Sequence, residues 1–216
     1  MRQRILLILC LLMTAGPLAG ESTRLVISDF STQGITNWES KTFSNETIYT
    51  LEQQGQQTVL KAVSKDSASG LVKKTRVDLQ QYPYLNWRWR TESRLHGLNE
   101  TTKEGDDYVA RVYVVVSGGL FFWRTRALNY VWSSNMEKGM SWPNAFAGDN
   151  AMMLAIRSNE DERGRWYTER RNVYEDLKRY HGKEIRYIDA IAIMTDTDNS
   201  DGRATSYYGD IYFSSE

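Results

Sequence analysis

"YVARVYVVV", residues 108–116, decides the fold class, because its side chains alternate between two series. One series, from residue 110 to residue 116, holds only alanine and valine, while the other includes Arg111 and Tyr113. This period of two is typical of a β-strand with one face buried. The stretch therefore predicts a half-buried strand that presents an arginine and a tyrosine on its polar face.

Other parts of the chain repeat this alternation. "YLNWRWR", residues 84–90, places Trp87 and Trp89 on one face, where we expect them in the core, and arginines on the other. Further runs of this kind are "RLVISDF", "TVLKAV", "RALNYVWSS", "AMMLAIRS", "IDAIAIMTD" and "SYYGDIYF". Many short strands predict an all-β protein, an antiparallel two-sheet β-sandwich of the jelly-roll (galactose-binding-like) type.

A single helix is expected, near 173–181, within "NVYEDLKRYHG". Asn172 is suited to cap its first turn, and Gly182 to take the left-handed conformation after its last turn. His181 lies at the end of this helix, where a positive charge suits the helix dipole.

The first 20 residues, "MRQRILLILCLLMTAGPLAG", have the pattern of an export signal, with Arg2 and Arg4 before an apolar run and small residues at the end. The run is too short for a stable membrane anchor after cleavage. We therefore expect a signal peptide at 1–20 and a single β-sandwich domain at 21–216, located in the periplasm or secreted.

Composition excludes several kinds of site. Cys10, the single cysteine, falls in the predicted signal, which excludes cysteine nucleophiles, thiolate zinc sites and iron–sulfur clusters from the mature chain. The 27 basic and 27 acidic residues balance, so no basic field favours nucleic acid. No serine lies in a nucleophile elbow and no histidine pair has zinc spacing. Adjacent carboxylates at Asp106 and Asp107 would point to opposite faces if both lay in a strand.

Polar faces of two predicted strands carry the candidate ligand-binding residues Arg88, Arg90, Arg111 and Tyr113. Two interpretations stay open: these arginines pair with acids such as Asp106 and Asp107, or they line a concave groove for an anionic or hydroxyl-rich ligand. Both hold if the acids orient the arginines. Trp123 and Trp142 fall in turn-rich segments. We expect each of them either to form an exposed platform on which a sugar ring stacks or to fill the end of the sandwich.

An acidic stretch, "TDTDNSDG", lies at 195–202. No frame of it satisfies an EF-hand loop, because glycine and the final glutamate do not fall at the required positions. We expect a hairpin between two strands, with Asp and Asn side chains bonded to their own backbone. Asp196 and Asp198, two residues apart, are also candidate ligands for a structural calcium ion or partners for Arg203.

Several stretches together resemble the bacterial DUF3047 family: "SASGLVKK", "YLNWRWR", "KEGDDYVARVYVVV", "LNYVWSS", "WPNAF", "ERRN" and "IMTDTDNS…YYGDI". The resemblance implies no particular activity. The opening "SDF…W" and the closing "YYGDIYF" are similar to the first and last strands of jelly-roll carbohydrate-binding modules. In such modules a structural calcium often lies where these strands meet, which nominates Asp29 and Asp210.

These observations favour an exported, non-catalytic module that binds a polysaccharide or a cell-envelope glycan. One alternative is a polysaccharide lyase or glycoside hydrolase that uses Tyr113 and an arginine. Another is a structural envelope protein whose arginines form internal pairs with carboxylates.

Overall fold

A computed structural model describes residues 23–120 and 124–216. The predicted signal peptide, residues 1–20, lies outside the described residues. Among the residues described, no helix has the length and apolar character needed to cross a membrane.

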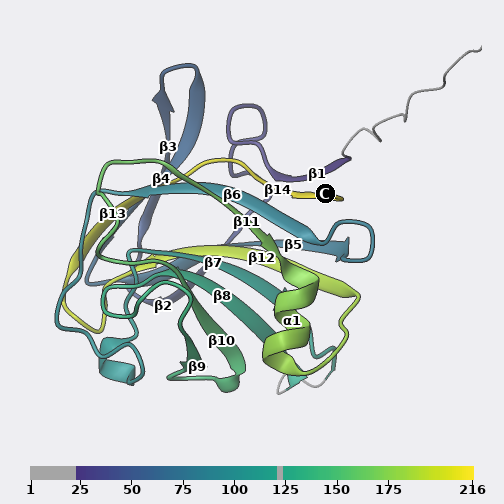
Figure 1. Cartoon of the computed structure of the whole chain (residues 1–216). Coiled ribbons are helices and arrows are strands. Elements are labelled where there is room, and N and C mark those ends of the chain that lie inside the picture. Colours follow the sequence, from purple (N-terminus) through teal and green to yellow (C-terminus); the bar gives the residue numbers. More distant parts are fainter. Residues whose placement is uncertain (1–22, 121–123) are drawn as a thin grey trace, which may run out of the picture.

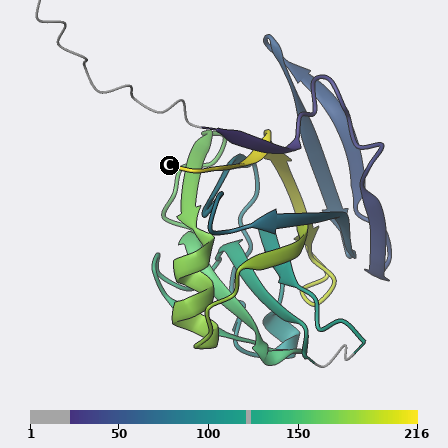
Figure 2. The same cartoon turned by 90° about the vertical axis from the view of Figure 1, so that its right-hand side faces the viewer.

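Two seven-stranded sheets lie face to face (Figures 1 and 2). The first sheet contains β1 (Arg24–Ser28), β14 (Ile211–Ser214), β6 (Tyr84–Thr91), β13 (Arg203–Tyr208), β4 (Gln57–Lys65) and β3 (Ile48–Gln54), with β11 (Tyr167–Asn172) on the other side of β6. The second sheet has the order β2 (Glu39–Ser44), β5 (Ala68–Asp78), β12 (Tyr187–Asp196), β7 (Ala110–Val116), β8 (Arg126–Trp132), β10 (Gly148–Arg157) and β9 (Ser141–Asn144). A short 3₁₀ helix, η1, spans Lys103–Gly105.

The path of the chain is that of a jelly roll. Strands β4, β5, β6 and β7 alternate between the two sheets, and β12 and β13 also lie in different sheets. The predicted all-β jelly-roll sandwich is therefore confirmed. One pair departs from the antiparallel rule, because β8 and β10 run parallel, with Asn129 opposite Met153. The intervening β9 pairs antiparallel with β10, and it occupies the edge of the second sheet.

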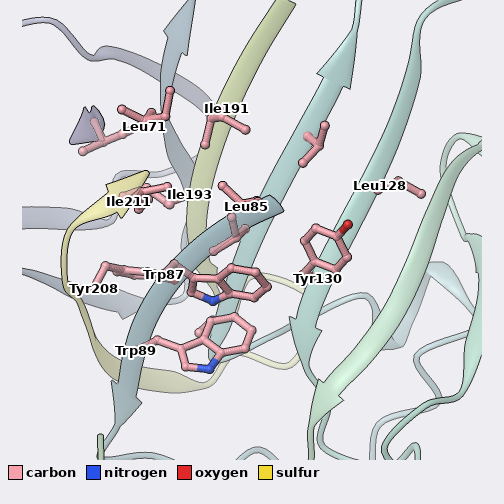
Figure 3. Close-up of a cluster of buried hydrophobic side chains, with 14 of the residues drawn as sticks. Leu71, Leu85, Trp87, Trp89, Leu128, Tyr130, Ile191, Ile193, Tyr208 and Ile211 are labelled. Carbon is pink, nitrogen blue, oxygen red and sulfur yellow. The ribbon is translucent and has the colours of Figure 1, made fainter. Parts of the chain in front are cut away.

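The core lies between the sheets and is rich in aromatic rings (Figure 3). Trp87 and Trp89 are 2% and 0% exposed, which confirms their predicted place in the core. The Trp87 ring stacks at 5.3 Å on Tyr130 and meets Trp89 edge-on at 5.4 Å. The even-numbered residues of β7 face the same core, so its odd-numbered residues face outward. Burial of each large apolar side chain stabilises the fold by about 1.5–3 kcal/mol.

The predicted helix is α1 (Val173–His181), beside β10 and β11 (Figure 1). Asn172 Oδ1 accepts a hydrogen bond from Glu175 N at 3.1 Å, and Gly182 is left-handed with φ of 63°. Both capping predictions are confirmed. Asp176 Oδ2 accepts a hydrogen bond from Tyr130 Oη at 2.8 Å, which ties the helix to β8.

The predicted hairpin at 195–202 is wrong. Strands β12 and β13 flank this segment but belong to different sheets, so the acidic segment crosses the end of the sandwich from one sheet to the other. The run "SYYGDIYF" is also divided, at Gly209 and Asp210, into β13 and β14. Alternation identifies strands, but it does not assign them to a sheet.

Candidate functional site

A groove of about 520 Å³ lies on the outer face of the second sheet. Its floor is formed by outward side chains of β7, β8 and β12, which include Arg111, Tyr113, Asn129 and Met194. Its sides are formed at opposite edges of the sheet, by Phe43 of β2 and by Phe146 in the turn between β9 and β10. Acidic and amide side chains gather at the end where β12 stops: Asp106, Asp196, Asp198 and Asn199.

Arg111 is a buried residue of the floor beside the acidic end, with 4% of its surface exposed. Its Nε donates to Asp196 Oδ1 at 2.8 Å, and its Nη2 also contacts Asp196 Oδ2. Toward Asp106, Nη2 donates to the backbone oxygen at 2.7 Å and Nη1 lies 3.4 Å from Oδ2. The guanidinium also lies 4.4 Å from the Tyr108 ring centroid. Arg111 is therefore paired internally, with Asp106 as one interpretation predicted and with Asp196 in place of Asp107, and it also lines the groove.

A chain of contacts connects this arginine to one side of the groove. Asn144 Nδ2 donates to both carboxylate oxygens of Asp106, at 3.1 and 3.2 Å. The Oδ1 atom of Asn144 accepts hydrogen bonds from Phe146 N and Ala147 N, at 3.1 and 3.0 Å. The turn that presents Phe146 is thus fixed to the carboxylate that orients Arg111.

Both sides of the groove carry an exposed phenylalanine. Phe43 is 68% exposed and Phe146 is 60% exposed. Lys41 Nζ lies 5.9 Å from the Phe43 ring centroid, and Lys103 Nζ lies 5.5 Å from that of Phe146. Exposed aromatic rings on both sides of a mostly apolar floor that carries a few polar groups are typical of a ligand site.

The floor between the phenylalanines offers few, fixed polar atoms. Tyr113 Oη donates to Met194 Sδ at 3.4 Å, and loss of hydration raises the pKa of the Tyr113 phenol. Asn129 Nδ2 donates to Met153 Sδ at 3.1 Å, whereas its buried Oδ1 has no donor among the residues described.

Three carboxylates converge at the acidic end of the groove. Asp107, Asp196 and Asp198 each place an oxygen within 4.8 Å of the others. Burial, followed by the negative charge of Asp107, raises the pKa of Asp198. Asp106 and Asp107 both follow η1 and precede β7, so the opposed pointing expected of strand neighbours does not apply to them.

The structure does not bring the four predicted groove residues together. Arg88 and Arg90 lie on β6 of the first sheet, whereas Arg111 and Tyr113 lie on β7 of the second. The prediction that these four residues line one groove is therefore wrong. The Arg88 guanidinium lies 4.7 Å from the Trp166 ring centroid, and that of Arg90 lies 4.2 Å from the Tyr207 ring centroid. These two arginines belong to a cation–π arrangement on another surface.

The predicted platform at Trp142 is also corrected. Trp142 is 6% exposed, and its Nε1 donates to the backbone oxygen of Glu100 at 3.1 Å. It packs with Tyr108, Val131 and Met153 in a small apolar cluster on the outer face of the second sheet. Trp142 therefore fills space in a buried cluster and does not form an exposed platform. Trp123 lies outside the described residues.

Asp29 and Asp210, nominated for calcium, serve the backbone near β1 and β14. Asp29 Oδ1 accepts from Thr32 N at 3.0 Å, and hydrogen bonds from Thr32 lower the pKa of Asp29. Asp210 Oδ1 accepts from Phe30 N at 2.9 Å. These hydrogen bonds use Oδ1 of each carboxylate, and calcium at Asp29 and Asp210 stays a prediction.

Sequence reasoning missed Phe43, Asn144 and Phe146, and it considered Asp107 only as an acid near the arginines. One signal was available for Phe43, because it is the single aromatic residue in the polar strand "ESKTFS". The turn chemistry of "WPNAF" also indicated an exposed Phe146.

Comparisons with known proteins support membership of a family rather than an activity. No curated protein matches the chain. Solved structures of similar fold include a family 11 carbohydrate-binding module from Clostridium thermocellum in complex with a β-1,3-1,4-mixed-linked tetrasaccharide, with 11% identity, a TM-score of 0.47, and coverage of 88% of this chain and 94% of that one. A family 30 carbohydrate-binding module of a Clostridium thermocellum cellulase has 10% identity, a TM-score of 0.47, and coverage of 83% and 92%. The cellulose-induced protein Cip1 has 10% identity, a TM-score of 0.49, and coverage of 91% and 97%.

At such identities and scores these likenesses say nothing about what the groove binds. The match to a family model is of another kind, because it extends over residues 36–212 and so includes every strand that forms the groove. The resemblance expected from the sequence motifs is thereby confirmed, and the chain belongs to DUF3047, described as a family of proteins of unknown function.

Proposed function

We propose that this protein is an exported, non-catalytic module that binds a polysaccharide or another cell-envelope glycan in the groove of the second sheet. The observation that carries the proposal is the placing of exposed Phe43 and Phe146 on opposite sides of a floor with buried, pre-oriented polar groups. Export to the periplasm or the medium is supported by the signal-like pattern of residues 1–20.

The chemistry of a sugar matches this arrangement. A pyranose ring has apolar C–H faces, which pack on aromatic rings, and a rim of hydroxyl groups that both donate and accept hydrogen bonds. A hydroxyl that enters the groove would supply a donor to Asn129 Oδ1, since a buried acceptor without a donor is unfavourable. Asp196 and Asp106 fix the Arg111 guanidinium before any ligand arrives, which lowers the entropy lost on binding.

The lyase alternative is less favoured by the same residues. A tyrosine that acts as a base must lose its proton, and the raised pKa of Tyr113 opposes this. Arg111 is already bound to two carboxylates, so it is not free to neutralise an acidic sugar on its own. Binding without cleavage is the function that this geometry supports best.

The test is a glycan array followed by titration calorimetry with the best soluble glycan. We expect Phe146→Ala and Phe43→Ala each to weaken binding by about tenfold, which is about 1.4 kcal/mol. Ile48→Ala is the matched control, because Ile48 is a 62% exposed apolar residue on β3 of the other sheet. Equal loss in all three variants would contradict the groove, and release of reducing ends or unsaturated sugars would contradict the absence of catalysis.

A further inference from the structure

The acidic end of the groove has the composition of a cation site. Asp107, Asp196 and Asp198 come from two segments far apart in the sequence, yet an oxygen of each lies within 4.8 Å of the others. Two of these side chains are almost fully buried, Asp107 at 0% and Asp196 at 1% exposed. Carboxylates of one charge gathered in a buried place repel each other unless a cation lies among them.

A second, independent observation concerns the hydrogen bonds of Asp107. Its Oδ1 accepts from Asn199 N at 3.1 Å and from Asn199 Nδ2 at 3.2 Å. Its Oδ2 is buried and has no hydrogen-bond partner in the described part of the chain. Asn199 therefore fixes the orientation of the Asp107 carboxylate. The Oδ2 atom is shielded from solvent, and both of its lone pairs are still available for a hydrogen-bond donor or a cation. A buried carboxylate oxygen is costly without a hydrogen-bond donor or a cation, and a metal ion is one partner that offsets this cost.

The charges nearby are unequal. Arg111 supplies one positive charge to Asp106 and Asp196, and Asp107 and Asp198 lie beyond its ion pairs. Both oxygens of Asp196 contact Arg111, and each carboxylate oxygen has a further lone pair available for a cation. The negatively charged carboxylates at this end of the groove therefore outnumber the one positively charged guanidinium, that of Arg111.

We propose that Asp107, Asp196 and Asp198 bind a hard divalent cation, calcium, at the end of the groove. Calcium takes six to eight oxygen ligands in flexible geometry, so three carboxylates leave positions for other oxygens. Asp196 and Asp198 line the groove, and these positions face it. Magnesium fits less well, because it demands near-ideal octahedral geometry and loses its water reluctantly.

A consequence for recognition follows, and it rests on the proposed glycan function. Neighbouring hydroxyls of a sugar are hard oxygen ligands that can replace water on calcium. A glycan whose ring packs between Phe43 and Phe146 would then contact the ion with its hydroxyls. Calcium would make glycan binding stronger, and glycan would make calcium binding stronger by the same factor.

The experiment begins without glycan. The full mature chain, stripped with chelator, is titrated with calcium chloride by calorimetry and melted with calcium or with chelator. The variants are Asp107→Asn, Asp198→Asn and the control Glu137→Gln, at an exposed acid in the loop between β8 and β9. We expect calcium to bind the wild type and the control and to raise their Tm, and to do neither in the two Asn variants.

The melting temperature in chelator distinguishes an acid that binds the metal from an acid that only stabilises the fold. If Asp107 is a ligand, Asp107→Asn removes a repulsive charge and melts at the same temperature as the wild type or higher when calcium is absent. A lower Tm both with and without calcium would overturn the assignment of Asp107. Absence of calcium binding to the wild type at millimolar concentrations would overturn the site as a whole.

Titration of the best glycan with calcium and with chelator then tests the second part. A loss of at least tenfold in affinity in chelator supports direct contact between sugar and ion. Unchanged affinity contradicts that contact while the calcium site stands on its own titration. Failure of every glycan to bind contradicts the proposed function and leaves the calcium result unaffected.

Discussion

Arg111 of β7 and Asp196 of β12 face each other across neighbouring strands, with Arg111 Nε 2.8 Å from Asp196 Oδ1 and with 4% and 1% of their surfaces exposed. The pair lies under the groove and beside two further buried acids, Asp106 and Asp107. Removal of the guanidinium would leave Asp106 and Asp196 without their shared cation. Broken buried pairs of this kind are strongly destabilising, because desolvation of the remaining charge is no longer offset.

Arg111→Met is therefore expected to lower the free energy of unfolding by about 3–5 kcal/mol in chelator. Arg90→Met provides the comparison, because Arg90 pairs at 3.1 Å with Glu92, whose side chain is 43% exposed, and the expected change is about 1 kcal/mol or less. Urea denaturation of both variants gives the two values. Similar losses of unfolding free energy in the two variants would show that the Arg111 ion pair stabilises the fold no more than a surface ion pair does.

Trp142→Ala is expected to lower the free energy of unfolding by about 3–5 kcal/mol, since a large buried side chain leaves a cavity. Trp142→Phe keeps most of the packing and removes the hydrogen bond to Glu100, with an expected loss of about 1 kcal/mol. Thermal or urea unfolding distinguishes the two. A variant with unchanged stability and lost glycan binding would restore the platform role that the structure corrects.

Gly105→Ala tests the backbone that precedes the acidic pair. A Cβ atom at this position would lie 2.2 Å from the Asn99 backbone oxygen, so the chain must shift. We expect a loss of more than about 2 kcal/mol in stability together with weaker calcium binding, because Asp106 and Asp107 follow directly. Glu104→Ala, at the exposed neighbouring position, is the control and should change neither measurement. Intact calcium binding in Gly105→Ala would separate this turn from the acidic end of the groove.

His181 predicts a pH dependence of stability. Burial lowers the pKa of His181 in the folded protein, although its place at the end of α1 suits a positive charge. The unfolded chain takes up its proton near a pKa of about 6.5, and the folded chain resists it. Stability from this residue is therefore complete above about 6.5 and is lost as pH falls toward the lowered pKa.

The free energy of unfolding of wild type minus that of His181→Gln should fall between pH 7.5 and pH 5.5. The difference removes the contribution of the carboxylates, which both proteins share. A difference that does not change with pH would contradict the effect of burial on His181.

Alternation predicted the strands and their buried faces well, because each side chain of a strand reports the environment of its own face. It placed Trp87 in the core and Arg111 outside it correctly. It did not predict which sheet a strand joins, since this depends on pairing between distant segments. For that reason Arg88 and Arg111, both on outward faces, were expected in one groove and lie on different sheets.

The acidic end was partly predictable for the same reason. Asp196 and Asp198 are close in the sequence and their proximity could be inferred, whereas Asp107 joins them only because β7 pairs with β12. Phe43 and Phe146 lie at the two edges of the second sheet, and only the strand order shows that they face one groove. The local sequence pattern can therefore predict single residues of a site, but only the pairing of distant strands shows which of these residues lie together.

The side of the groove that carries Phe146 packs separately from the main core. Trp142, Tyr108, Val131, Met153 and Ala155 form an apolar cluster of their own, apart from the cluster between the sheets. Substitutions at the exposed Phe146, in the turn between β9 and β10, therefore alter the side of the groove, while the free energy of unfolding depends on buried residues such as Trp142. The groove proposed to bind a glycan can thus change at one edge of the second sheet while the core between the sheets stays the same.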